Sequence, residues 1–151
     1  MAKATFRQVL GAFPSGVTVV TTHHKGEDLG LTVSAFASLS LDPEMVLVSI
    51  DNSSRTLAVL SVGAPIAVSI LAAHQGAVAR QFASGLPDKF AGVACRRLGD
   101  VPVIEDAAGW ISGRVAGLFP GGDHTIVTIA VSHLELSGNP PMVYANGIIG
   151  S

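Results

Sequence analysis

The chain contains a single cysteine, and this scarcity limits how the protein can be stabilised. Cys95 has no second cysteine to pair with, so an intramolecular disulfide is impossible. No apolar run approaches the ~20 residues that a membrane-spanning helix needs. The N-terminal stretch MAKATFRQVLGAF also lacks the long apolar core of a signal peptide. These absences predict a cytoplasmic protein without a membrane partner.

Charged residues are scarce as well. They make up only 13% of the chain, whereas about 25% is average. The net charge is −2 and no basic run occurs, which argues against a nucleic-acid partner. Hydrophobic residues make up 48% of the chain, and the mean hydropathy is +0.51. A chain this apolar without a membrane span indicates surface hidden between subunits, and we expect a homodimer.

Several motifs of common enzyme classes are missing. The chain has no G-x-G-x-x-G or G-x-x-x-x-G-K-[ST] sequence, which excludes the usual Rossmann and P-loop fingerprints. It has no G-x-S-x-G elbow and no Ser-x-x-Lys pair, so a serine nucleophile is unsupported. His23 and His24 are adjacent and would face opposite sides of a strand. His74 and His133 have no partner at ligand spacing, and we therefore expect no metal site.

At 151 residues the chain is most simply one domain, spanning 1–151. We expect helices at 6–12, 54–61 and 74–83, with the apolar residues of the first (Phe6, Val9, Leu10 and Phe13) facing inward. A polar hairpin loop is expected over 23–28, and Phe90–Val93 fits a helical turn. Apolar and β-branched runs predict strands at 16–22, 29–33, 45–50, 65–71, 110–118, 125–136 and from 141. Six or more strands with few helices predict a mainly β fold, an antiparallel barrel with peripheral helices.

A run of small side chains follows the strand predicted at 29–33. Ser34, Ala35, Ala37, Ser38 and Ser40 cannot fill a core as Leu or Phe would. They leave the backbone open to close approach by something flat. The run therefore suggests a platform for a planar ligand.

A second group of hydroxyl side chains follows the next strand. Ser53, Ser54 and Thr56 surround Arg55 and lead into an apolar, helix-like segment. Hydroxyls, a guanidinium and the free amides of a helix start are the groups that bind phosphate. A flat platform beside a phosphate site favours a mononucleotide cofactor. A surface turn with a Ser-rich helix cap is the alternative.

The sequence PGGDH (120–124) predicts a tight β-turn between the two longest strands. Asp123 and His124 begin the second of these strands, where their side chains are held rigidly. An imidazole there could bind a ligand carbonyl, or contact the edge of a nicotinamide or flavin. A turn without further function is the alternative.

Five fragments occur together in one order: FRQVLGAFPSGVTVVTT, GLTVSAFASLSLDPEMVLVSIDNSSRT, ARQFAS, DKFAGV and GDHTIV. In this order and spacing, over about residues 6 to 144, the chain resembles the flavin reductase family with the FMN-binding split-barrel fold. These proteins are the small reductase components of two-component flavin monooxygenases. The resemblance implies an antiparallel split β-barrel with a few peripheral helices.

The resemblance also implies a set of flavin-binding residues. Backbone amides and hydroxyls of Thr32, Val33, Ser34 and Ala35 would line the isoalloxazine ring, with Ser38 and Ser40 on the loop below. The ribityl chain and phosphate would lie against Asp51, Ser53, Ser54, Arg55 and Thr56. Phe82, Lys89 and Phe90 would border the flavin from a neighbouring segment.

The nicotinamide site is implied in the same way. His124 resembles the histidine of the family that orients the nicotinamide. Tyr144 and Gly147 resemble the start of a C-terminal Y-x-x-G-x-aromatic motif. The chain departs from this motif at Ile149, where an aromatic residue is usual.

By this resemblance the expected activity is NAD(P)H-dependent reduction of free FMN or FAD. Reduced flavin would then pass to a separate oxygenase. A non-enzymatic flavin-binding or carrier protein of the same fold is the first alternative. A reductase of another small substrate, with permanently bound flavin, is the second.

Overall fold

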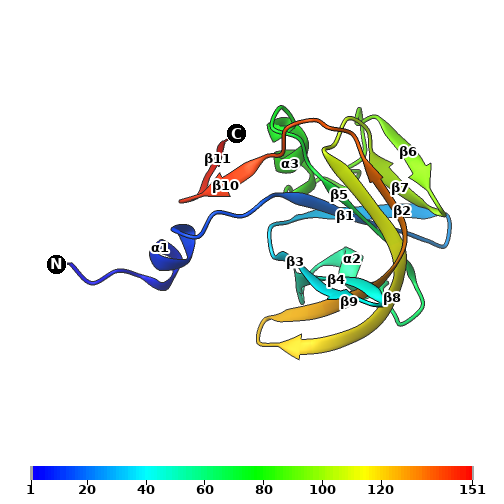
Figure 1. Cartoon of the computed structure of the whole chain (residues 1–151), viewed down its shortest axis with the longest axis horizontal. Coiled ribbons are helices and arrows are strands. Elements are labelled where there is room, and N and C mark those ends of the chain that lie inside the picture. Colours follow the sequence, from blue (N-terminus) through cyan, green and yellow to red (C-terminus); the bar gives the residue numbers. More distant parts are fainter. Residues whose placement is uncertain (1, 151) are drawn as a thin grey trace.

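The computed structural model describes residues 2–150, and its main feature is a seven-stranded antiparallel sheet (Figure 1). The strands lie in the order β2-β1-β5-β8-β9-β4-β3. Their bounds are β1 (Thr18–His24), β2 (Glu27–Val33), β3 (Phe36–Leu41), β4 (Glu44–Asp51), β5 (Pro65–Ile70), β8 (Gly109–Gly121) and β9 (His124–Leu136). The mainly β, antiparallel fold predicted from the sequence is confirmed.

The two edge strands of this sheet are consecutive in the chain. β2 ends at Val33 and β3 begins at Phe36, so only Ser34 and Ala35 join the two ends of the strand order. So short a link can connect the edges only if the sheet curls round until they approach, and Figure 1 shows this curvature. Within residues 2–150 no ladder of hydrogen bonds joins β2 to β3. The sheet is therefore a barrel split between these two strands.

The inside of the curled sheet holds the largest hydrophobic core. Alternate residues of each strand point inward, as the period of two in a strand requires. Full burial of each such side chain contributes about 1.5–3 kcal/mol. The buried members are Val20, Val33, Val46, Val48, Ile50, Leu60, Ile66, Val68, Ile111, Val115, Val127 and Ile129.

A helix and a small hairpin cover the outside of the barrel. The helix α3 (Gly76–Phe82) buries Ala79 and Phe82, the face that its apolar spacing predicts. The hairpin of β6 (Cys95–Leu98) and β7 (Val101–Ile104) packs with Trp110 in a separate core cluster. These elements place α3 beside β2, at the edge of the split.

The N-terminal helix corrects one prediction. Thr5 caps α1 (Phe6–Gly11) through its side chain, which accepts from the Gln8 amide at 3.2 Å. The apolar residues Phe6, Val9, Leu10 and Phe13 were expected to face inward, yet Phe6 is 81% and Phe13 76% exposed. The prediction is wrong for the single chain, because α1 stands away from the barrel (Figure 1). Its end contacts the C-terminal hairpin, where the Asn146 amide donates to the Gly11 carbonyl at 2.7 Å.

Three other segments differ from the sequence expectations. Most of the run of small residues after β2 belongs to the edge strand β3, so Ser38 and Ser40 lie on a strand and not on a loop. The loop expected over 23–28 shrinks to two residues, because both strands extend to Lys25 and Gly26, which take positive φ values of 50° and 79°. The helix expected over 54–61 is the single turn α2 (Arg55–Ala58).

The C-terminus ends in a second small hairpin of β10 (Val143–Ala145) and β11 (Ile148–Gly150). An isolated bridge between Ser15 and Tyr144 ties it to the segment before β1. The sequence predicted the first of these strands but not the second. Across the described residues, every helix is too short or too polar to cross a bilayer.

Candidate functional site

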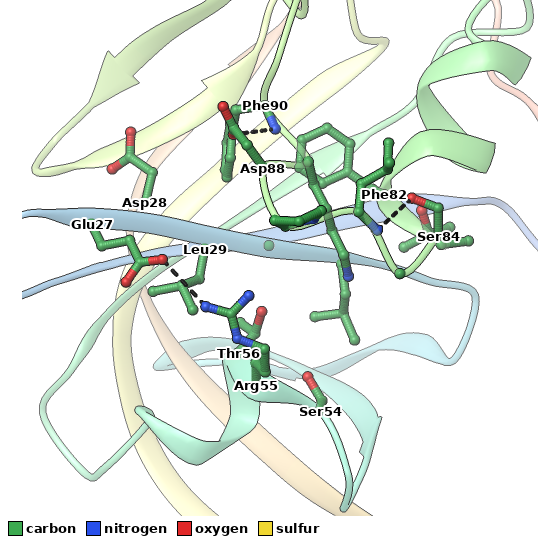
Figure 2. A pocket seen from close by; sticks show the side chains of 18 of the residues that line it. Glu27, Asp28, Leu29, Ser54, Arg55, Thr56, Phe82, Ser84, Asp88 and Phe90 are labelled. Carbon is green, nitrogen blue, oxygen red and sulfur yellow. Dashed lines mark hydrogen bonds and ion pairs between the residues drawn. The ribbon is translucent and has the colours of Figure 1, made fainter.

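The main cleft has a volume of about 820 Å³ and lies at the split edge of the barrel (Figure 2). Three parts of the chain enclose it. They are strand β2 with its turn, the segment from Asp51 to α2, and the loop that follows α3. The lining residues are Gly26, Glu27, Asp28, Leu29, Gly30, Leu31, Thr32, Asp51, Ser53, Ser54, Arg55, Thr56, Phe82, Ala83, Ser84, Gly85, Leu86, Pro87, Asp88, Lys89 and Phe90.

The turn after β4 is held in shape by its own side chains. The Asp51 carboxylate accepts from the Ser53 amide at 2.8 Å and from the Ser53 hydroxyl at 2.7 Å. The hydrogen bond from the Ser53 amide is the main reason that the pKa of Asp51 lies below its ordinary value, so this carboxylate is charged at neutral pH. The Ser54 hydroxyl accepts from the Leu57 amide at 3.3 Å and caps α2. Its own O–H stays available as a donor at the cleft wall.

Two cations lie in the cleft, on opposite walls. Arg55 begins α2, and Lys89 lies in the loop after α3. Burial is the main cause that lowers the pKa of Lys89, and the charge of Arg55 lowers it further. Among residues 2–150, no carboxylate lies within 4.0 Å of the Lys89 ammonium. Two neighbouring cations, one of them without a counter-ion, favour binding of an anion between them.

Two aromatic rings belong to the wall formed by α3 and the loop after it. Phe82 is fully buried, and its ring meets Phe90 edge-to-face with 4.9 Å between ring centroids. Thr32 on β2 donates its hydroxyl to the Ala79 carbonyl at 2.6 Å, which fixes α3 against the strand. Gly30 leaves space for Phe82, because a Cβ there would lie 3.2 Å from that ring. The cleft therefore joins a polar, cationic end to an aromatic one.

A second, smaller cavity of about 240 Å³ continues from the first. The two share Thr32 and Ala83. Tyr144 and Ile149, partners in the β10–β11 ladder, form its outer wall. Ile149 also packs against the core cluster around Phe82, so the wall is present although its residue is aliphatic. The remaining lining residues are Val17, Ser34, Ala79 and Arg80.

A comparison with protein families matches residues 10–150 to the flavin reductase like domain. The chain belongs to this family. The family assignment expected from the sequence fragments is confirmed.

Flavin reductases of known role are similar over most of this chain. The reductase subunit HsaB of a flavin-dependent monooxygenase from Mycobacterium tuberculosis is 40% identical over 87% of this chain and 71% of its own. The reductase component of a 4-nitrophenol 4-monooxygenase/4-nitrocatechol 2-monooxygenase from Rhodococcus opacus is 36% identical over 98% of this chain and 80% of its own. Among solved structures, the NADH:FAD oxidoreductase SgcE6 of Streptomyces globisporus, in complex with NAD and FAD fragments, is 34% identical with a TM-score of 0.87. That match covers 96% of this chain and 89% of the other.

Most of the residues expected to bind flavin lie together in this flavin reductase. Nine of them line the main cleft: Thr32, Asp51, Ser53, Ser54, Arg55, Thr56, Phe82, Lys89 and Phe90. Ser34 and Tyr144 line the second cavity. The side chain of Val33 is buried in the barrel core, so only its backbone is left for a ligand. Ala35, Ser38 and Ser40 line neither cavity.

His124 itself lines neither cavity, although its strand neighbour Asp51 lines the main cleft. It pairs with Asp51 across β4 and β9, and its Nδ1 lies 2.8 Å from the Asp123 carboxylate. A His Nδ1–H that donates to a carboxylate leaves Nε2 free for a ligand. Its side chain is 41% exposed, so it is open to a molecule that arrives from outside. The nicotinamide role expected for His124 stays a prediction.

Sequence reasoning missed one whole wall of the cleft. Glu27 and Asp28 line it, although they were expected in a polar hairpin loop. Asp28 lies 2.7 Å from His23 Nδ1 and accepts from Arg97 at 2.9 Å. Burial raises the pKa of Asp28, but these hydrogen bonds outweigh it and hold the pKa below the ordinary value. The alternation of Leu29 and Leu31 with polar residues was the available signal that the strand begins earlier.

Cys95, the single cysteine of the chain, is partly buried. Burial, followed by the charges of Asp28 and Glu105, raises the pKa of the Cys95 thiol despite nearby Arg97. A raised pKa keeps the thiol protonated, which makes it a weak nucleophile. Within the described residues, no group of three or more His, Cys, Asp or Glu side chains could hold a metal ion.

Proposed function

We propose that this protein reduces free flavin with a reduced nicotinamide nucleotide and releases the product to a separate oxygenase. The observation that carries the proposal is the cleft itself. Arg55 and Lys89 lie at one end, where Lys89 has no carboxylate partner among residues 2–150, and an aromatic wall lies at the other. A flavin nucleotide has the same division, with a phosphate at one end and a flat ring system at the other. The names of the relatives support the same activity, since they are reductase components of monooxygenases and a flavin reductase (NADH).

The residues at the cationic end fit a phosphate. Arg55 and Lys89 supply charge, and the Ser54 hydroxyl supplies a neutral donor. Charge-assisted bonds of this kind are about twice as strong as neutral ones. Thr56 is buried beneath them and anchors α2 to the barrel. The phosphate end therefore holds the ligand in one register along the cleft.

The other end of the cleft orients the ring. Thr32 near the end of β2 and Ser34 just after it line the second cavity, and Phe82 with Phe90 closes the side of the main cleft. The flavin and the nicotinamide supply the chemistry, a hydride transfer from nicotinamide C4 to flavin N5. The protein binds and aligns the two rings and excludes water. No side chain serves as a nucleophile, which agrees with the absence of nucleophile motifs from the sequence.

The proposal is tested by the dependence of NADH oxidation on added flavin. We expect the initial rate to rise with FMN or FAD concentration and to saturate, because flavin enters and leaves as a substrate. A rate that is already maximal without added flavin indicates a permanently bound cofactor and overturns the free-flavin mechanism.

His124→Ala should impair hydride transfer more than flavin binding. A neutral or charged imidazole can orient a carboxamide through its free Nε2. We expect KM for NADH to rise or kcat to fall about tenfold, near 1.4 kcal/mol, with a much smaller change in the flavin dissociation constant. Steady-state kinetics with each substrate varied in turn measures both. Lost flavin binding with intact NADH kinetics moves His124 to the flavin site, and no change in either leaves it a turn residue.

The protein should be a dimer in solution. Phe6, Val9 and Leu10 of α1 and Phe13 just after it are exposed in the single chain, and burial against a second copy would remove them from water. Light scattering at micromolar concentration should give about twice the 15.4 kDa chain mass. Phe6→Ser combined with Phe13→Ser should shift the equilibrium toward monomer. A monomer that still reduces flavin contradicts this prediction.

A further inference from the structure

An ion pair crosses the mouth of the main cleft. Arg55 Nη2 lies 3.3 Å from Glu27 Oε1, so a bond links α2 to the start of β2 (Figure 2). The side chains are 68% and 60% exposed, so water and a ligand reach both. Among residues 2–150, Arg55 forms an ion pair with Glu27 alone, and Glu27 forms one with Arg55 alone. The proposed phosphate ligand Arg55 is therefore already engaged before flavin arrives.

The other carboxylates of the cleft have different partners. Asp28 is held by His23 and Arg97. Asp51 accepts from Ser53, and Asp88 accepts from the Phe90 amide at 3.1 Å. Glu27 alone depends on Arg55. Any anion that binds the guanidinium must either displace Glu27 or share Arg55 with it at close range, where two negative charges repel each other.

We propose that Glu27 competes with the flavin phosphate for Arg55 and thereby keeps flavin exchangeable. This inference rests on the proposed function, because only a flavin that is released needs such competition. An exposed ion pair shifts an equilibrium by about two- to fivefold. The pair therefore weakens flavin binding without blocking it. When flavin leaves, Glu27 recovers its partner, which favours release of the product.

The test compares Glu27→Gln with the unchanged protein. Glutamine keeps the shape and removes the charge, so FMN should bind about two- to fivefold more tightly and dissociate more slowly. Riboflavin has no phosphate, and its dissociation constant should stay the same. Flavin fluorescence quenching measures both equilibria, and stopped-flow displacement measures dissociation. Glu44→Gln is the matched control, because Glu44 is an exposed carboxylate of β4 that does not line the cleft.

A second background separates competition from general charge repulsion. In Arg55→Gln, the further change Glu27→Gln should leave FMN affinity unaltered, since the contested group is gone. An equal gain in that background, or an equal gain for riboflavin, overturns the competition for Arg55. Weaker FMN binding by Glu27→Gln overturns it as well, because Glu27 would then orient Arg55 for the phosphate. An unchanged affinity also overturns it. If the unchanged protein binds no FMN at all, the proposed function fails together with this inference.

Discussion

Replacement of Arg55 by Ala should weaken FMN binding by about 1.5 to 3 kcal/mol, the scale of a charge-assisted hydrogen bond. Arg55 is the exposed cation at the start of α2, and it faces Lys89 across the cleft. Its loss leaves the phosphate with Lys89 and hydroxyl donors only. Flavin titration by fluorescence quenching gives the dissociation constant directly.

Two comparisons make the Arg55 result specific. Riboflavin should bind the Arg55→Ala variant as it binds the unchanged protein, because it has no phosphate for Arg55 to hold. Arg114→Ala is a charge-matched control, since Arg114 is an exposed residue of β8 outside the cleft. An FMN dissociation constant that does not change removes Arg55 from the binding site.

Gly113→Ala should destabilise the fold strongly, because the added methyl group clashes with the backbone of the neighbouring strand. Gly113 lies at an irregularity in the β8–β9 pairing, and a Cβ there would lie 1.9 Å from the Ala130 carbonyl oxygen. Because the clashing atom belongs to the backbone, the hydrogen-bond ladder between β8 and β9 must break or shift to relieve the clash. We expect a loss of about 3 kcal/mol or more in the free energy of unfolding.

Urea unfolding followed by circular dichroism measures this loss. Gly16→Ala provides the control, because its added methyl would meet only the Met142 carbonyl, at 4.0 Å. Equal midpoints for the two variants contradict the close approach of β8 and β9 at Gly113.

The strands of the barrel were largely predictable from the sequence, because burial leaves a local pattern. In β8 and β9, apolar residues alternate with polar ones or follow each other directly, on both sides of a glycine-rich turn. This pattern can be recognised without knowing which strands pair with them. The small side chains of β3 give no such pattern, since Ala and Ser are weak strand formers. Pairing with β4 makes this segment a strand, and that pairing is a tertiary effect.

The apolar face of α1 shows a different limit of sequence reasoning. Its spacing predicts a buried face, and the face is apolar, yet nothing in the single chain covers Phe6 and Phe13. An amphipathic sequence pattern predicts that one face of a helix is buried, but it does not identify the surface that covers this face. The excess of apolar residues in the composition points to a second copy, as does this helix.

The cleft was predicted in part. The group around Arg55 that we propose to bind phosphate is contiguous in the chain, so its chemistry is visible in the sequence. Glu27 is brought to Arg55 from the preceding hairpin, and the contact depends on how the barrel curls. A contact between residues that are far apart in the chain leaves no local sequence pattern, so the pair of Glu27 with Arg55 is visible only in the structure.

The most direct test of the proposed function follows NADH at 340 nm after purified protein is mixed with NADH and FMN. The account predicts that absorbance falls at a rate proportional to protein concentration, and that the rate without flavin is negligible. The Arg55→Ala variant should need a higher FMN concentration for the same rate. A protein that quenches flavin fluorescence but never accelerates NADH oxidation is a flavin carrier, and that result would contradict the central claim.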